Sequence, residues 1–254
     1  MRIRPGIELG NLTDVGCERD DNQDYYCYAE PEPDGEFERK GRLVVIADGM
    51  GGYEGGAIAS GIAVDVLRAR YLHSECEETE QALVEAITAA HEAIREFTRE
   101  HPEVADMGTT CTAAVLRNSH LSYIHVGDSR LYLFRNSEIT QLTRDHTVTE
   151  RLIEEGRLRP EEAPFHPDYH VLTAALGVGQ TLHAQFPETP VQLLANDVLL
   201  LCTDGLHDLV KAEEMRDTAL GYPSGTACQK LIAQAKSRGG PDNITLQIIK
   251  VQGA

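Results

Sequence analysis

Four aspartates lie next to apolar, strand-like runs that are spread along the whole chain. They are Asp48 after LVVIA, Asp128 after LSYIHVG, Asp204 after VLLLCT and Asp242 in GGPDNITLQII, with Gly49, Gly127 and Gly205 beside the first three. One Asp-Gly at the end of a strand is usually only a turn. Four carboxylates at strand ends could instead converge at the rim of a sheet, where they would repel one another unless cations neutralised them. The pattern therefore predicts a cluster of oxygen ligands for hard divalent metal ions.

The type of ligand restricts which metal ions the site can bind. Aspartates, backbone carbonyls and water suit Mg²⁺ or Mn²⁺, whereas zinc normally recruits His and Cys. The six cysteines include no CxxC pair, the chain has no HExxH motif, and its ten histidines show no ligand spacing. We therefore expect Mn²⁺ or Mg²⁺ and no structural zinc site.

Size and charge restrict the class of protein. With 254 residues, 41% of them hydrophobic, the chain can bury a full core, so we expect a single domain over residues 1–254. The net charge of -18 argues against a nucleic-acid partner and against anionic membrane surfaces. The N-terminal residues lack the apolar stretch of a signal peptide, and no segment approaches the ~20 apolar residues that span a bilayer. Unpatterned cysteines fit a reducing compartment, so we expect a cytoplasmic protein, most simply a monomer.

The first half of the chain contains one loop pattern and two helical patterns. PEPDGEFERKGR (31–42) has the Pro, Asp and Gly of a hairpin loop between two strands. Residues 54–72 and 79–100 carry apolar side chains at helical spacing, and the second stripe stops before Pro102. We interpret both stripes as faces that pack on a core.

The rest of the chain alternates strands with short connections. TTCTAAVL, HLSYIHVG and RLYLFRN follow one another closely, which favours antiparallel pairing because parallel strands need a long crossover. Residues 145–180 mix a short helical segment with three prolines and are expected to form a surface excursion. The strand VLLLC, a helix from about Ser224 to Lys236 and the strand ITLQIIKV complete the chain. This order predicts an α+β fold, a layered α/β/β/α sandwich.

Arg19 lies in the polar segment TDVGCERDDNQD. A guanidinium offers a planar fork of donors that matches phosphate oxygens. Taken alone, Arg19 is more simply explained by a surface ion pair with Asp20, Asp21 or Asp14. Beside two metals roughly 4 Å apart, however, an arginine would hold a phosphate while the metals activate water. GMGG at 49–52 does not fit a nucleotide-binding P-loop, so a phosphoester is favoured over ATP as the substrate.

Eight segments occur in a recognisable order. They are TDVGCERDDNQD, LVVIADGMGG, GTTCTAAVL, YIHVGDSRLYLF, LTRDH, LTAALG, LLCTDGL and GGPDNITL. From about residue 8 to 250, the chain resembles bacterial members of the metal-dependent serine/threonine protein phosphatase family, the type 2C or PPM class. The resemblance implies two antiparallel sheets that face each other between helices, with the metals at one end.

The resemblance also implies the ligands of two core metal ions. Asp48 would bridge both ions, and Gly49 would add its backbone carbonyl to one of them. Asp204 and Asp242 would complete the shell of the other ion, and Asp24 would act through water.

Further roles follow from the same resemblance. Asp128 of the GDSR segment would hold a third, weaker metal together with Asp204, and Arg19 would bind the substrate phosphate. Residues 145–180 would be the flap that touches the protein substrate. The residues expected to carry catalysis are then Asp48, Asp204, Asp242 and Arg19.

Two departures from the family's pattern concern the segment after Asp48. The usual bacterial pattern reads DGMGGHxxGE, whereas this chain reads DGMGGYEGG, and we interpret Tyr53 and Gly56 as the replacements of the His and the Glu. Some members carry a His directly after Asp-Gly, proposed as proton donor, where this chain has Met50. The proton donor therefore stays unassigned, and three histidines that could be considered are expected to be structural. These are His125, His146 and His166.

Three functions are compatible with a metal site of this kind. The first is hydrolysis of phosphoserine and phosphothreonine on proteins with Mn²⁺ or Mg²⁺, opposing a bacterial Ser/Thr kinase. The second is a catalytically silent member that binds phosphoproteins as a regulator, whose mark would be a missing metal aspartate; none is missing. The third is a metal-dependent phosphodiesterase acting on nucleic acid, which the charge of -18 disfavours.

Overall fold

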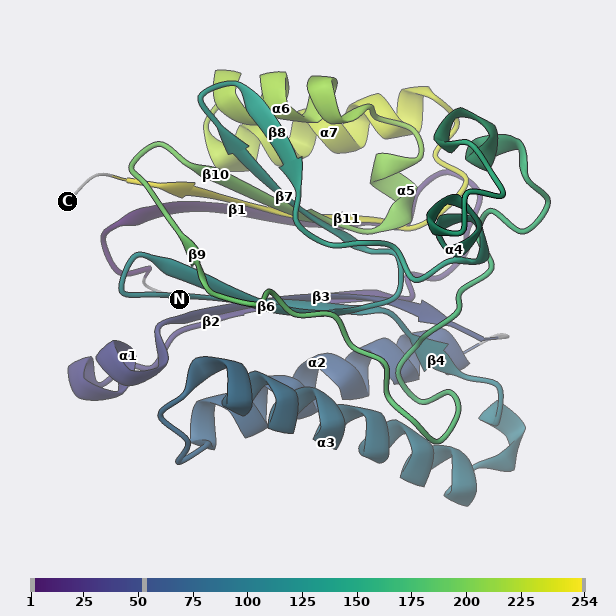
Figure 1. Ribbon diagram of the computed structural model, residues 1–254, viewed down its shortest axis with the longest axis horizontal. Helices are drawn as coiled ribbons and strands as arrows, with labels where there is room; N and C mark the ends of the chain where they lie inside the picture. Colours follow the sequence, from purple (N-terminus) through teal and green to yellow (C-terminus); the bar gives the residue numbers. More distant parts are fainter. Residues whose placement is uncertain (1–2, 52–53, 253–254) are drawn as a thin grey trace.

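The computed structural model describes residues 3–51 and 54–252, and these residues form two antiparallel sheets packed face to face (Figure 1). One sheet has the strand order β1-β11-β10-β7-β8. The other has the order β2-β3-β5-β6-β9, and β4 pairs with β3. Helices α2 and α3 cover the outer face of the second sheet, and α6 and α7 cover that of the first. The predicted layered α/β/β/α sandwich is confirmed.

The elements have the following bounds. The strands are β1 (Ile7–Asp14), β2 (Asp24–Ala29), β3 (Arg42–Met50), β4 (Gly108–Thr109), β5 (Cys111–Arg117), β6 (His120–Val126), β7 (Arg130–Arg135), β8 (Glu138–Gln141), β9 (Val191–Gln192), β10 (Val198–Cys202) and β11 (Ile244–Val251). The α-helices are α1 (Asp34–Lys40), α2 (Gly55–His73), α3 (Thr79–Glu100), α4 (Val148–Glu154), α5 (Asp204–His207), α6 (Ala212–Gly221) and α7 (Ser224–Ser237). Among these described helices, none is long and apolar enough to cross a membrane.

The central strands are apolar on both faces because each sheet is covered on both sides. In β3, Leu43 and Val45 point to the helices, whereas Val44 and Ile46 point to the opposite sheet. Successive side chains of a strand point to opposite faces, so a strand in the middle of four layers needs an unbroken apolar run. This explains why LVVIA and VLLLC lack the polar alternation of a half-exposed strand.

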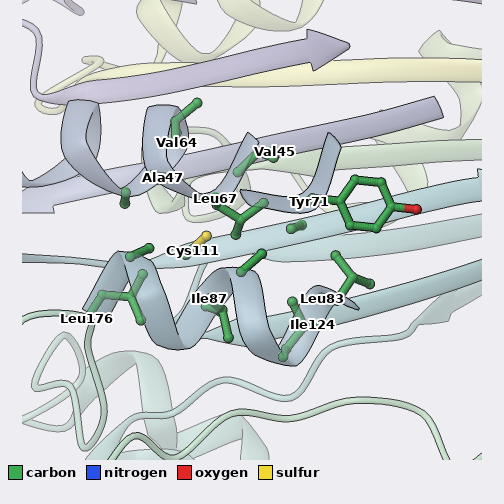
Figure 2. Packing of buried hydrophobic residues seen from close by; sticks show 14 of the residues in the cluster. Val45, Ala47, Val64, Leu67, Tyr71, Leu83, Ile87, Cys111, Ile124 and Leu176 are labelled. Carbon is green, nitrogen blue, oxygen red and sulfur yellow. The ribbon is translucent and has the colours of Figure 1, made fainter. Parts of the chain in front are cut away.

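Figure 2 shows the packing of α2 and α3 on their sheet. Leu83, Ile87, Ala90 and Ile94 of α3 are all buried and recur at intervals of three or four residues, which places them on one helix face. The helices predicted at 54–72 and 79–100 are confirmed to within one residue. The predicted helix beginning at Ser224 is also confirmed. Neither α6 nor the short strand β8 was predicted.

The segment 31–42 differs from its prediction. Strands β2 and β3 are antiparallel neighbours, so the hairpin is confirmed, but its connection contains helix α1. The helix has acidic residues in its first turn and basic residues in its last, an order that favours it through the helix dipole. Lys40 at its end is only 1% exposed, and its Nζ donates to the backbone oxygen of Cys76 at 3.0 Å. The Asp-Gly pair was wrongly interpreted as a turn, whereas it starts a helix that docks on the body of the protein.

Residues 145–180 form α4 and a 3-10 helix, Pro160–Phe165, before the chain returns to the sheets. Thr147 caps α4, since its Oγ1 accepts a hydrogen bond from Glu150 N at 3.1 Å. The returning chain is held by isolated β-bridges between Thr147 and Leu172 and between Thr109 and Leu176. The first bridge closes the base of the excursion on itself, and the second fastens its returning end to β4.

Candidate metal centre

Asp24 and Asp48 lie directly opposite each other on the paired strands β2 and β3. Like charges in directly opposed positions destabilise a sheet, so this pairing points to a functional requirement. Asp24 is 6% exposed, and its Oδ2 accepts a hydrogen bond from Thr203 Oγ1 at 2.9 Å. Its Oδ1 is buried without a hydrogen-bond partner among the described residues.

Asp128, Asp204 and Asp242 reach the same end of the sandwich from three different connections. Asp128 follows β6, and Asp204 follows β10 and begins α5. Asp242 lies just before β11 and not after an apolar strand. Because β10 and β11 are antiparallel, the end of one meets the start of the other, which brings Asp204 and Asp242 to one edge.

The cluster surrounds a cavity of about 370 Å³. The lining includes all but one of the residues predicted for the site, namely Arg19, Asp48, Gly49, Asp128, Asp204 and Asp242. The remaining one, Asp24, is buried directly beside Asp48. The structure therefore brings all the predicted site residues together, from segments that are up to 223 positions apart.

Four carboxylates of this cluster resist ionisation in the absence of cations. Burial, and then the charges of Asp204 and Asp242, raise the pKa of Asp24 to about 7. The pKa of Asp48 is raised well above its ordinary value by burial and by the neighbouring carboxylates. Burial and adjacent acidic groups also raise the pKa values of Asp128 and Asp204. Such a group of carboxylates is stable in the charged form only when positive charge is supplied.

The donor set fits hard divalent cations. Buried oxygens without a hydrogen-bond partner among the described residues are found on both Asp24 (Oδ1) and Asp204 (Oδ1). Carboxylate oxygens are the ligands that Mg²⁺ and Mn²⁺ prefer. None of the six cysteines lines the cavity.

Two threonines hold the backbone of Asp48. Thr109 Oγ1 donates to Asp48 O at 2.8 Å, and Asp48 N donates to Thr110 Oγ1 at 2.9 Å. The hydroxyl of Thr110 also lies 2.7 Å from Ser129 Oγ, next to Asp128. These contacts fix Asp48 relative to the loop that carries Asp128. Sequence reasoning missed both threonines, because TTC reads as an ordinary stretch of strand.

The Glu of the family's usual pattern cannot correspond to Gly56. A Cβ added at Gly56 would lie 2.6 Å from Gln23 Oε1 and 2.7 Å from Gly49 O, so no side chain fits there. Our interpretation of Gly56 as the replacement was wrong, and matching the pattern letter by letter puts Ala57 at that position. Tyr53 lies outside the described residues.

Arg19 lies at the rim of the cavity and is 54% exposed along its side chain. Its Nη2 donates to Asp242 Oδ2 at 2.8 Å. Of the surface partners considered from the sequence, Asp14 is engaged elsewhere, since Lys236 Nζ donates to it at 2.7 Å. The guanidinium thus faces the carboxylate cluster, and its phosphate-binding role stays a prediction.

The three histidines named from the sequence do not line the cavity. His125 is fully buried with its Nδ1 2.8 Å from Thr112 Oγ1, and burial lowers its pKa to about 3. The histidine that does line the cavity is His170, which was not singled out. Its Nδ1 lies 3.9 Å from Asp204 Oδ2 and 3.6 Å from Asp208 Oδ2. No spacing could have revealed it, because only the return of the excursion brings it there.

Comparison with known proteins gives a consistent result for the whole chain. The model of the family described as Protein phosphatase 2C matches residues 21–231. Protein phosphatase PhpP of Streptococcus pneumoniae is 32% identical over 250 residues, which cover 96% of this chain and 98% of that protein. Serine/threonine protein phosphatase PstP of Mycobacterium tuberculosis is 38% identical over 216 residues, 83% of this chain and 40% of that protein.

Solved structures agree in fold. The crystal structure of the Mycobacterium tuberculosis phosphatase PstP/Ppp superimposes with a TM-score of 0.86 at 32% identity, covering 98% of this chain and 100% of that one. The structure of the PstP catalytic domain in complex with two manganese ions gives a TM-score of 0.83 at 30% identity, with coverage of 98% and 99%.

Proposed function

The chain belongs to the protein phosphatase 2C family, and on this basis we propose that it is a metal-dependent protein serine/threonine phosphatase. It hydrolyses phosphoserine and phosphothreonine on proteins with Mn²⁺ or Mg²⁺ as cofactor. The observation that carries this function is the cavity in which four aspartates and one arginine face one another, with a fifth aspartate behind them. A regulator without activity would not need to keep such a costly cluster of carboxylates.

Two metal ions would be held by the side chains of Asp48, Asp204 and Asp242 and by the backbone carbonyl of Gly49. Asp24, buried behind Asp48, would act through water. Asp128 and Asp204 would hold a third, weaker ion. When bound, the ions activate a water molecule and polarise the phosphoryl group.

The protein's own groups position the substrate. Arg19 exchanges its hydrogen bond to Asp242 for hydrogen bonds to the phosphate, which keeps the phosphate over the carboxylates. Thr109 and Thr110 keep Asp48 in place during this exchange, since each of them holds one backbone group of that residue. Met50, which also lines the cavity, has no titratable proton, so the leaving group must take its proton from another source.

The finer biological role is also part of the proposal. The chain would act in the cytoplasm as a single-domain monomer and reverse the action of a bacterial Ser/Thr kinase in signal transduction, with residues 145–180 touching the protein substrate. Six free thiols support a reducing compartment. Helices over the outer face of each sheet support a monomer, because within the described residues both sheets are already covered.

The test is Mn²⁺-dependent release of phosphate from a small aryl phosphate and from a phosphothreonine peptide. Activity should vanish with EDTA and return with Mn²⁺ or Mg²⁺, without any need for zinc. Asp48→Ala should be the most damaging single change, because Asp48 would be a ligand of both core ions. Activity that survives exhaustive chelation, or a wild-type rate in Asp48→Ala, would contradict the proposed function.

A further inference from the structure

We propose that a second hollow beside the carboxylate cavity binds an apolar side chain of the substrate, within two residues of the phosphorylated one. This inference rests on the proposed function. The hollow measures about 360 Å³, and part of its lining is formed by Thr173, Gly179, Gln180, Thr181 and His183. Its apolar wall consists of Met50, Leu172, Ala174, Ala175 and Val178. We call these residues the apolar groove.

The apolar groove is continuous with the carboxylate cavity. Met50 and Leu172 line both hollows, and Met50 is two residues from Asp48 on the same strand. An extended peptide advances by about 3.3–3.6 Å per residue. A substrate with its phosphate over the aspartates therefore has the side chains of the next one or two residues at the entrance of the apolar groove.

The segment that forms the groove is fastened to the residues that hold Asp48. The backbone groups of Thr109 and Leu176 exchange hydrogen bonds of 3.2 and 2.8 Å, and the side chain of the same Thr109 donates to Asp48 O. The next residue, Gly177, donates its N–H to His91 Nδ1 of α3 at 3.1 Å. Figure 1 shows this segment in green, descending from α4 past β4 toward α3 before it returns to β9.

Such anchoring makes the groove a preformed feature. A preformed site loses less conformational entropy when a ligand binds than a site that must first be ordered. The position of the groove relative to Asp48 therefore suits the recognition of one side chain close to the phosphorylated residue.

The wall of the groove offers apolar surface that the protein itself leaves open. Val178 is 48% exposed. The methyl ends of Met50 and Val178 both lie over Gly108, because a Cβ added at Gly108 would lie 2.8 Å from Met50 Cε and 2.9 Å from Val178 Cγ2. An aliphatic side chain from the substrate would remove this surface from water, whereas a short polar side chain would leave the surface exposed to solvent.

The first experiment uses the Mn²⁺-loaded enzyme and phosphothreonine peptides that differ at one position. Leu or Ser is placed in turn at the two positions before and the two positions after the phosphothreonine, and kcat/KM is measured. At one of these positions we expect Leu to give a kcat/KM about 10-fold higher than Ser, the scale set by a few methylene groups in an apolar pocket. Equal kcat/KM values for Leu and Ser at all four positions would overturn the assignment of the groove but leave the phosphatase activity intact. A complete absence of Mn²⁺-dependent hydrolysis, with every peptide, would overturn both the groove and the proposed function.

The second experiment uses a pair of matched variants. Val178→Asp puts a charge into the groove, and Val171→Asp puts the same charge on the same segment at a valine of similar exposure, 47%, that does not line the groove. Val178→Asp should abolish the Leu preference and raise kcat/KM for a peptide with Lys at that position. Val171→Asp should keep the Leu preference, with thermal melts used to check that both variants fold. Loss of the preference in both variants, or in neither, would overturn the assignment.

Discussion

Arg19 donates to Asp242 from the rim of the cavity, and in the proposed function the same guanidinium would turn to the substrate phosphate. An exposed ion pair of this kind contributes little to stability. We therefore predict that Arg19→Ala leaves the melting temperature nearly unchanged while it raises KM more than it lowers kcat. A lost charge-assisted hydrogen bond is worth about 1.5–3 kcal/mol, or about 10- to 100-fold in kcat/KM.

Steady-state kinetics on a phosphopeptide check this prediction. Arg68→Ala is the matched control, because Arg68 is similarly exposed (47%) and pairs with Asp65 on the surface of α2. If Arg19→Ala had the KM of the wild type, Arg19 would not bind the substrate phosphate and would only form a surface ion pair.

At the scale of elements, the site depends on how the junction of β4 and β5 holds β3. Thr110, 2% exposed, accepts a hydrogen bond from Asp48 N and contacts Ser129 of the β6–β7 connection. Thr110→Val removes these contacts and leaves a buried N–H without its side-chain acceptor, at a cost of about 1–3 kcal/mol. We predict a rise of about 10-fold or more in the Mn²⁺ concentration for half-maximal activity, since groups that orient ligands tune metal affinity by such factors.

Titration of activity with Mn²⁺ gives the measurement, and Thr143→Val provides the comparison. Thr143 is buried to a similar degree and also accepts a backbone N–H, from Leu131 at 3.0 Å, but it does not contact Asp48. If both variants shifted the Mn²⁺ titration equally, the effect would reflect lost stability and not the hold on Asp48.

At the scale of the whole molecule, the metal-free protein carries a net charge of -18 and a cluster of buried and half-buried carboxylates. The pKa of Asp24 is about 7 in the fold against an ordinary 3.8, so the folded state binds this proton more tightly than the unfolded chain. The contribution of this proton to the free energy of unfolding is fully present below about pH 4 and is lost as the pH rises through 7. We predict that Asp24→Asn melts at a higher temperature than the wild type in EDTA, with a larger difference at pH 8 than at pH 5.

Melting curves of both proteins at the two pH values provide the measurement, with Asp65→Asn on the surface of α2 as the control. Added Mn²⁺ should stabilise the wild type by about 2.7 kcal/mol at a hundredfold excess over its Kd. A difference between Asp24→Asn and the wild type that is the same at pH 5 and pH 8 would contradict the raised pKa.

Local sequence patterns were enough to predict the layers and most of the candidate metal centre. Helical stripes such as that of α3 and unbroken apolar strands such as β3 and β10 are local patterns, and each follows from which faces of an element must be buried. Aspartates next to such strands then had to lie at the sheet edge. The resemblance in motif order added Asp24 and gave specific roles to Asp128 and Arg19, for which the residues alone left a turn and a surface ion pair open.

Which groups meet could not be predicted from local patterns. Strand register places Asp24 opposite Asp48, and the pairing of Arg19 with Asp242 joins positions 223 residues apart. The return of residues 172–183 brings His170 to the cavity and builds the groove beside Met50. Helix α1 was missed because an Asp-Gly pair has the same local signal in a turn and at a helix start. Side-chain periodicity is set by one element at a time, whereas contacts depend on strand order and register, which arise from packing the whole chain at once.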